Sequence, residues 1–207
     1  MKLVVATNNK HKLTEFRRIL GGYFEEVYSL SDAGIISDAE ETGDTFKKNA
    51  YIKARAVADA LIGKYGEKVL SEYAVLADDS GLSVDALSGL PGVTSARYAS
   101  SDGKDASDED NRRKLLAEMK DKTDRRARFT SALALITAGE VYFAEGHVEG
   151  RILTEEKGEN GFGYDRLFFC DKLGKSFGEA TAAEKDSVSH RAAATENLIG
   201  MFGNNFK

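Results

Sequence analysis

The stretch Leu76-Ala-Asp-Asp-Ser-Gly-Leu82 places two adjacent carboxylates directly after an apolar run. The residues Tyr73 to Ala77 are typical of a strand buried in a sheet. A buried pair of carboxylates is costly unless cations or protons compensate it, and strand ends that face a crevice are where open α/β sheets bind ligands. The stretch therefore suggests a site for a metal ion and water at Asp78 and Asp79. Taken alone, the same residues favour a plain turn, because Asp, Ser and Gly are common turn formers.

Apolar runs and helix-period stripes follow one another on both sides of this stretch, which indicates an α/β protein. We predict strands over 2–6, 25–30, 73–77, 82–86, 125–137, 141–153 and 167–169. We predict helices over 11–20, 45–65, 107–120 and 181–186, and a last helix that begins at Ser189. The strand 82–86 is expected to be a hairpin partner, and the long strands 125–137 and 141–153 indicate a sheet that is covered on both faces.

Bulk properties exclude several classes of protein. The 207 residues carry a formal net charge of −5, which disfavours a general nucleic-acid binder. The lone Cys170 cannot form an internal disulfide and fits a reducing compartment, so we expect a cytoplasmic protein. The longest apolar run, Ala132 to Ile136, is far shorter than the roughly 20 residues that a membrane span needs.

Three segments carry side chains that could bind an anion. The first predicted strand leads through Thr7, Asn8 and Asn9 into a helix, and the N-terminus of a helix binds anions through its free N–H groups. Lys10 and Lys12 add positive charge there, although lysines are also common solvated surface residues. Lys53 lies beside the apolar stripe of its helix, where it either extends towards solvent or holds an anion.

Two further segments could bind a flat, polar ligand. The glycine-rich loop Gly158–Asp165 contains Phe162 and Tyr164, which either stack on a base or fold back onto the core. Ser189 precedes His190 and Arg191 at the start of the last helix, where the helix dipole opposes cations. Cations at that position are better explained by an acceptor that they bind than by helix stability.

The candidate residues divide into three chemical sets. Glu40, Glu41, Asp78 and Asp79 supply the hard oxygen ligands that suit Mg²⁺. Polar and cationic side chains suit a polyphosphate, and they are Thr7, Asn9, Lys12 and Lys53. The remaining set could hold a heterocyclic base, and it comprises Phe162, Tyr164, Lys185, His190 and Arg191. Metal, phosphate and base sites together indicate a hydrolase of nucleotide polyphosphates.

Several motifs occur in an order that resembles one known family. They are Ala6-Thr-Asn-Asn-Lys-His-Lys12, Glu41-Thr-Gly-Asp-Thr-Phe46, Ala77-Asp-Asp-Ser-Gly-Leu82, Gly89-Leu-Pro-Gly92, Ser95-Ala-Arg-Tyr98, Gly161-Phe-Gly-Tyr-Asp165 and Ser189-His-Arg191. On these motifs the chain resembles the inosine/xanthosine triphosphate pyrophosphatases, which are house-cleaning nucleotidases. The resemblance implies one domain over residues 1–207, with an elongated mixed sheet flanked by helices and two lobes with a cleft between them. It also implies a homodimer that uses Mg²⁺ to hydrolyse dITP, ITP, XTP or dXTP to the monophosphate and pyrophosphate.

The resemblance also implies roles for individual residues. Asp79 would be the catalytic proton acceptor and a metal ligand, with Glu40 or Glu41 as the other acidic ligand. The substrate would be bound by Thr7, Asn8, Asn9, Lys10, His11, Lys12, Lys53, Ser80, Phe162, Gly163, Tyr164, Asp165, Lys185, His190 and Arg191. The family often has Gly at the positions of Asn8 and His11 and Pro at that of Arg166. The alternatives are a pyrophosphatase with another base preference and a catalytically silent nucleotide-binding module.

Overall fold

The structure is a computed structural model that describes residues 1–202. Its strands are β1 (Lys2–Val5), β2 (Val27–Tyr28), β3 (Tyr73–Val84), β4 (Arg126–Ile136), β5 (Val141–Ile152), β6 (Phe168–Cys170) and β7 (Lys175–Ser176). Its α-helices are α1 (Lys10–Leu20), α2 (Phe46–Tyr65), α3 (Asp108–Glu118), α4 (Ala182–Asp186) and α5 (His190–Phe202). Short 3₁₀ helices cover Glu67–Ser71, Asp85–Leu87 and Gly92–Arg97. The predicted α/β class is confirmed.

The strands form one mixed sheet in the order β2-β1-β3-β4-β5-β6-β7. Strand β1 pairs in parallel with β2 and with β3, whereas β6 pairs antiparallel with β5 and with β7. The edge strands β2 and β7 have only two residues each, so β2 is shorter than predicted and β7 was not predicted at all. Such short strands leave too few residues for a periodic pattern to show in the sequence.

The predicted break between residues 77 and 82 is absent, because β3 runs through it as one strand from Tyr73 to Val84. The alternative of a plain turn at Asp78 and Asp79 is therefore wrong, and the hairpin partner predicted over 82–86 is the second half of the same strand. Both aspartates are buried in β3. Burial of both carboxylates within the strand is tolerated because Lys12, Arg191 and Lys53, from other elements, compensate their charge.

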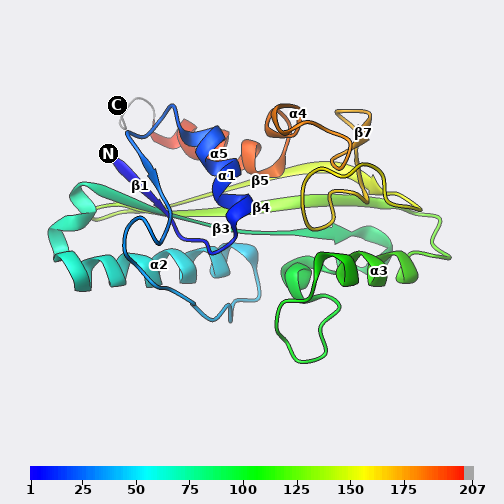
Figure 1. Cartoon of the computed structure of the whole chain (residues 1–207), viewed down its shortest axis with the longest axis horizontal. Helices are drawn as coiled ribbons and strands as arrows, with labels where there is room; N and C mark the ends of the chain where they lie inside the picture. Colours follow the sequence, from blue (N-terminus) through cyan, green and yellow to red (C-terminus); the bar gives the residue numbers. More distant parts are fainter. Residues whose placement is uncertain (203–207) are drawn as a thin grey trace. The chain divides into compact units, whose positions relative to one another are not determined.

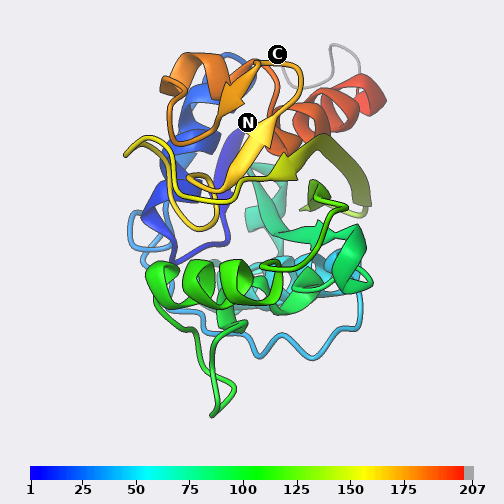
Figure 2. The same cartoon turned by 90° about the vertical axis from the view of Figure 1, so that its right-hand side faces the viewer.

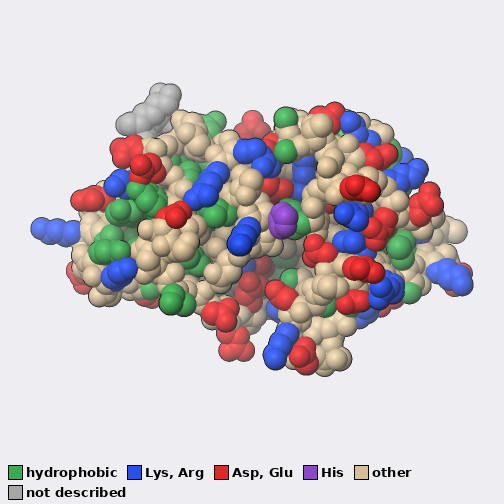
Figure 3. Space-filling model, in the orientation of Figure 1, with side chains coloured by type: hydrophobic (Ala, Val, Ile, Leu, Met, Phe, Trp, Pro, Cys, Tyr) green, Lys and Arg blue, Asp and Glu red, His purple; other side chains and the backbone are tan. Residues whose placement is uncertain are grey.

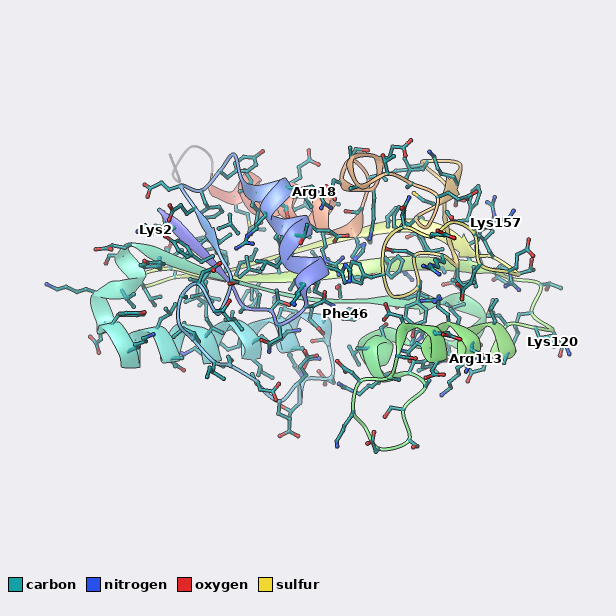
Figure 4. All side chains as sticks on the ribbon, viewed as in Figure 1. Lys2, Arg18, Phe46, Arg113, Lys120 and Lys157 are labelled. Atoms are coloured by element: carbon teal, nitrogen blue, oxygen red, sulfur yellow. The ribbon has the colours of Figure 1, made fainter. Side chains whose placement is uncertain are left out.

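The chain divides into two compact units, which we describe separately. The first comprises residues 1–79, 131–146 and the described residues from Arg191 onward, and the second comprises residues 80–130 and 147–190. In the first unit, α2 lies on one side of β1 and β3, and α1 and α5 lie on the other side (Figure 1). In Figure 4, Phe46 marks the start of α2 and Arg18 marks α1.

The core of the first unit has two layers because successive strand residues point to opposite faces. Val4, Val75 and Ala77 pack in a cluster with the apolar stripe of α2, which consists of Ala50, Ala54, Val57, Ala58 and Leu61. Leu3, Val5, Ala74 and Leu76 pack in a second cluster with residues of α1 and α5, which are Phe16, Leu20, Ala194 and Leu198. The even-numbered residues of β3 thus face α1 and α5, and the odd-numbered residues face α2.

The second unit has an apolar cluster that includes Leu115 of α3 and Met119, the residue directly after this helix. Helix α3 lies on one side of the strands of this unit and α4 lies on the other side (Figure 2). Acidic and basic side chains are interspersed on the face of the molecule shown in Figure 3. Within residues 1–202, no helix combines the length and the apolar character that crossing a membrane would require.

Candidate active site

The two neighbouring aspartates of β3 point to opposite faces of the sheet. Asp78 follows Ala74 and Leu76 in the even series and contacts residues of α1 and α5, whereas Asp79 contacts residues of α2. The strand therefore separates two carboxylates that are adjacent in sequence. Each has its own set of partners and its own chemistry.

Asp78 is the centre of a buried ionic cluster on the α1 and α5 side. Its Oδ1 accepts a hydrogen bond from Ser131 Oγ at 2.6 Å. Its Oδ2 lies 2.9 Å from Lys12 Nζ and 3.3 Å from Arg191 Nε. Arg191 Nη1 also donates to Glu15 Oε2 at 2.7 Å. Both oxygens of Asp78 are thus occupied by groups of the protein itself.

The charges around Asp78 keep it ionised. Burial by itself raises the pKa of this carboxyl, but Lys12, Arg191 and the hydrogen bond from Ser131 outweigh burial and hold the pKa far below its usual range. Burial also lowers the pKa of Lys12, against the attraction of Asp78. Asp78 is therefore a permanent anion that holds Lys12 and Arg191 in place, and it has little capacity to accept a proton at neutral pH.

Asp79 belongs to a separate cluster on the α2 side. Lys53 Nζ donates to Asp79 Oδ1 at 2.8 Å and to Glu41 Oε1 at 2.9 Å. Asn49 Nδ2 donates to Asp79 Oδ2 at 3.2 Å, and Asn49 Oδ1 accepts from Gly43 N at 2.7 Å. Asn49 and Lys53 lie four residues apart on α2, so that both side chains reach the same carboxylate.

The electrostatic state of Asp79 differs from that of Asp78. Burial raises the pKa of Asp79, and Glu41 raises it further, against the attraction of Lys53 and Lys12. Burial lowers the pKa of Lys53, but Asp79 and Glu41 more than offset this effect, so the pKa of Lys53 lies above its usual value. A carboxylate with a raised pKa is a stronger base than an ordinary aspartate, which suits a proton acceptor.

The carboxylates of this cluster fit a divalent cation that takes its remaining ligands from elsewhere. Within residues 1–202, no group of three or more His, Cys, Asp and Glu side chains is arranged to hold a metal. Asp79 and Glu41 nevertheless both approach the Lys53 ammonium, so the protein already places a positive charge at these two carboxylates. Mg²⁺ is usually held by one or two carboxylates, together with waters and substrate phosphates. Glu40 is exposed, which favours Glu41 as the second acidic ligand.

The segment that leads into α1 is held by its own side chains. The Asn9 side chain caps the helix, because its Oδ1 accepts from His11 N at 2.9 Å and from Lys12 N at 3.2 Å. Thr7 Oγ1 accepts from Asn9 N at 3.1 Å, and Asn8 Nδ2 donates to Ser37 O at 3.0 Å. Lys10 and His11 are exposed. The cap already uses two of the N–H groups that an anion at this helix terminus would need.

In the second unit, the glycine-rich loop is tied to α4. Asp165 Oδ2 accepts from Phe162 N at 2.9 Å and from Lys185 Nζ at 2.7 Å. The same ammonium lies 4.7 Å from the centre of the half-buried Phe162 ring. Tyr164 is buried in the core of this unit, and its hydroxyl donates to Ser95 O at 2.8 Å. Phe162 and Lys185 are thus brought together, whereas the Tyr164 ring packs into the core.

The second unit also contains the predicted residues His190, Ser80 and Gly163. His190 is buried and stacks on Phe129, with the ring centres 4.9 Å apart and an angle of 13° between the rings. Ser80 is half-buried in β3. Gly163 has a φ of +59°, a conformation that favours glycine.

Several residues that hold these groups were not predicted. They are Glu15, which pairs with Arg191; Asn49, which bonds Asp79; and Asp108 and Arg112, which bond the backbone of Gly163. Glu15 follows Lys12 by three residues, so the two charged side chains lie on one face of α1, and this spacing was the available signal. The signal for Asn49 was its place four residues before Lys53, on the same face of the helix. No local signal marks Asp108 and Arg112, because their partner Gly163 is distant in sequence.

Replacing Asn49 with alanine is expected to reduce both stability and activity. The change removes the acceptor of Gly43 N and one donor to Asp79, and a buried polar group left without its partner costs about 1–3 kcal/mol. Urea unfolding and steady-state kinetics measure the two effects. Lys48→Ala, at an exposed position of the same helix turn, is the control. Equal behaviour of the two variants would exclude a role of Asn49 in the site.

Comparisons with known proteins cover nearly the whole chain. A profile described as the Ham1 family matches residues 3–201. A protein of Thermoanaerobacter sp. (strain X514) named dITP/XTP pyrophosphatase is 44% identical over 200 residues, which cover 96% of this chain and 94% of that protein. A Bacillus subtilis (strain 168) protein of the same name is 45% identical over 198 residues, covering 94% of this chain and 93% of its own.

Solved structures show the same similarity. The Ham1 protein of Staphylococcus aureus matches with a TM-score of 0.81 and 38% identity, covering 99% of this chain and 100% of its own. A HAM1 protein from Coxiella burnetii matches with a TM-score of 0.80 and 36% identity, covering 98% of each chain.

Proposed function

Because the chain belongs to the Ham1 family, we propose that it hydrolyses nonstandard purine nucleoside triphosphates to the monophosphate and pyrophosphate. The substrates are dITP and ITP, XTP and dXTP, and the reaction removes them from the nucleotide pool. The observation that carries this proposal is the 44% identity, over 96% of this chain, with a relative named dITP/XTP pyrophosphatase. The residues of both clusters lie within the range that the family profile matches.

The first unit supplies the groups for phosphate chemistry. Asp79 accepts a proton from the water that attacks the α-phosphorus, and burial gives this carboxylate the basicity for that role. A new bond forms from the water oxygen to the α-phosphorus, and the bond from the α-phosphorus to the bridging oxygen breaks. Lys12 and Lys53 balance the charge of the departing pyrophosphate. The segment from Thr7 to Lys12 binds the phosphates.

We propose that Mg²⁺ is the cofactor of this reaction. Asp79 and Glu41 would hold the ion, because their carboxylates already share one positive charge in the Lys53 ammonium. A bound Mg²⁺ would supply withdrawal of charge from the phosphate oxygens. Lys53 donates hydrogen bonds to both carboxylates. In the proposed reaction, its ammonium donates to a phosphate oxygen instead.

The second unit supplies the groups for the base. Phe162 presents a ring, and the Lys185 ammonium beside it has donors for an acceptor at position 6 of the purine. Hypoxanthine and xanthine carry an oxygen there, whereas adenine carries an amino donor. A donor left without an acceptor in the pocket discriminates strongly against the wrong substrate. Gly163, Tyr164, Asp165, Ser80 and His190 complete the proposed set of this unit. Arg191 is a further proposed substrate-binding residue.

Two further properties follow from the family resemblance as proposals. The enzyme is a homodimer, and it acts in the cytoplasm on small-molecule nucleotides. The single buried Cys170 and the net charge of −5 support a reducing location and a substrate other than nucleic acid.

A panel of nucleoside triphosphates tests the proposed function. We expect pyrophosphate and monophosphate from dITP and XTP, and little product from the four standard dNTPs. Removal of Mg²⁺ with EDTA should lower the rate by about 100-fold or more, because metal polarisation of phosphate is worth several kcal/mol. Added Mg²⁺ should restore it.

Each other result of the panel assigns the chain differently. Release from modified pyrimidine or methylated nucleotides instead would indicate another base preference. Binding of dITP without release of pyrophosphate would indicate a catalytically silent nucleotide-binding module. A rate that EDTA leaves unchanged would remove Mg²⁺ from the mechanism.

A further inference from the structure

Helix α3 holds both polar groups of one peptide residue in the glycine-rich loop. Gly163 N donates to Asp108 Oδ2 at 2.7 Å, and Gly163 O accepts from Arg112 Nη1 at 2.9 Å. Asp108 and Arg112 lie four residues apart, so they occupy one face of α3. The loop is thus fixed at a residue directly after Phe162, by side chains far from it in sequence.

Arg112 differs from its neighbour Arg113 in a way that points to a specific role. The Arg112 side chain is only 9% exposed, and its Nε also donates to Glu156 Oε1 at 2.8 Å. The Arg113 side chain is 68% exposed and pairs with Glu109 and Asp110 of its own helix. Arg113 is therefore a surface residue, whereas Arg112 binds Gly163 of the loop and Glu156, which precedes the loop. Figure 4 labels Arg113 on α3 and Lys157, which follows Glu156 in the sequence.

Helix α3 is itself held by side-chain hydrogen bonds, so it can support the loop. Ser107 Oγ caps its first turn by accepting from Asp110 N at 3.1 Å. Asn111 accepts from Ala99 N at 2.8 Å and donates to Ala96 O at 2.9 Å, which ties the helix to the neighbouring 3₁₀ helix. The side chains that hold Gly163 therefore project from a fixed element.

Phe162 is attached at its own N–H and at the residue that follows it. Asp165 Oδ2 accepts from Phe162 N and from Lys185 Nζ, and α3 binds Gly163. Displacing Gly163 would move Phe162 relative to the Lys185 ammonium. The geometry of the pair would change although neither side chain is altered.

We propose that Asp108 and Arg112 are positioning residues that set base selectivity by fixing the loop through Gly163. This inference rests on the proposed function, because that function assigns Phe162 and Lys185 to the base. None of the contacts that carry it involves Asp79, Lys53 or Lys12. We call the two hydrogen bonds from Asp108 and Arg112 to Gly163 the clamp. Loss of the clamp should therefore affect recognition of the base and leave the chemical step nearly intact.

The test compares Arg112→Gln with its matched control Arg113→Gln on dITP and dATP. For Arg112→Gln we expect KM for dITP to rise about 10-fold or more, and the ratio of kcat/KM for dITP over dATP to fall by a similar factor, with kcat nearly unchanged. Arg112→Lys, which can still reach one acceptor, should recover part of the ratio. Arg113→Gln should behave as the wild type.

A second variant protects the test against a folding defect of Arg112→Gln. Asp108 is exposed, so Asp108→Ala should fold, and it removes the other half of the clamp. We expect the same shift in selectivity, but smaller, with Glu109→Ala as its control. A ratio that stays at the wild-type value in a folded Asp108→Ala would overturn the inference.

A fluorescence measurement separates this inference from the proposed function. The chain contains no tryptophan, so Phe162→Trp gives a single reporter on the loop. Acrylamide should quench this reporter more strongly when Arg112→Gln is added than when Arg113→Gln is added. Equal quenching in the two backgrounds would overturn the proposed role of the clamp. Absence of pyrophosphate release from the wild type would overturn the proposed function instead, and the quenching result could still be interpreted.

Discussion

Asp79→Asn is expected to slow pyrophosphate release from dITP by about 10²–10⁴-fold, the usual contribution of a general base. Asparagine has nearly the same shape as aspartate, but it carries no charge and cannot accept the proton of the attacking water. Lys53 keeps Glu41 as a partner in the variant, so the fold should persist. Single-turnover kinetics with excess enzyme and circular dichroism measure the two effects.

Asp59→Asn provides the matched control for this prediction. Asp59 lies on α2, as Lys53 does, and its exposed side chain pairs only with Arg55 in the contacts that the structure shows. It should retain the wild-type rate. Turnover of Asp79→Asn within a few-fold of the control would remove Asp79 from the chemical step.

Asp78→Ala is expected to produce the largest loss of stability, about 3–5 kcal/mol, because it leaves buried cations without their counter-charge. The Lys12 and Arg191 side chains are 16% and 4% exposed, and both depend on Asp78 Oδ2. Glu15 would remain as a partner of Arg191 alone. Urea unfolding followed by circular dichroism gives the difference in the free energy of unfolding.

The surface pair of Arg55 and Asp59 again supplies the reference. Asp59→Ala should cost no more than about 0.3–0.5 kcal/mol, as is usual for exposed pairs four residues apart on a helix. A loss below about 1 kcal/mol for Asp78→Ala would contradict the assignment of Asp78 as the anion that holds the cluster together, because a broken buried pair costs several times that amount.

Much of the fold could be predicted from periodicity, because long elements carry strong patterns. The helix predicted over 45–65 is α2, with the predicted apolar stripe and Thr45 as its cap. The turn at 78–81 was wrong for a physical reason. Local preferences describe Asp, Ser and Gly in water, whereas the strand is stabilised by Lys12 and Lys53, which come from distant parts of the chain.

The residue types of the site could be predicted more readily than their pairings. A cation at the start of the last helix indicated an acceptor, and the acceptors that the structure shows for Arg191 are Asp78 and Glu15 of the protein itself. The different fates of Phe162 and Tyr164 depend on which ring the core accommodates, and no local pattern records that. The role of Arg112 depends on a contact across 51 positions of sequence with Gly163.

The opposed directions of Asp78 and Asp79 have a consequence for how the central strand tolerates length changes. Deleting or inserting a single residue within 73–77 would slide the two acids by one step and exchange their faces. After an insertion, Asp78 would take the position at which Asp79 contacts Asn49 and Lys53 of α2. After a deletion, Asp79 would take the position of Asp78 beside Lys12 and Arg191. The buried charges thus disfavour a shifted register of β3, independently of their proposed role in catalysis.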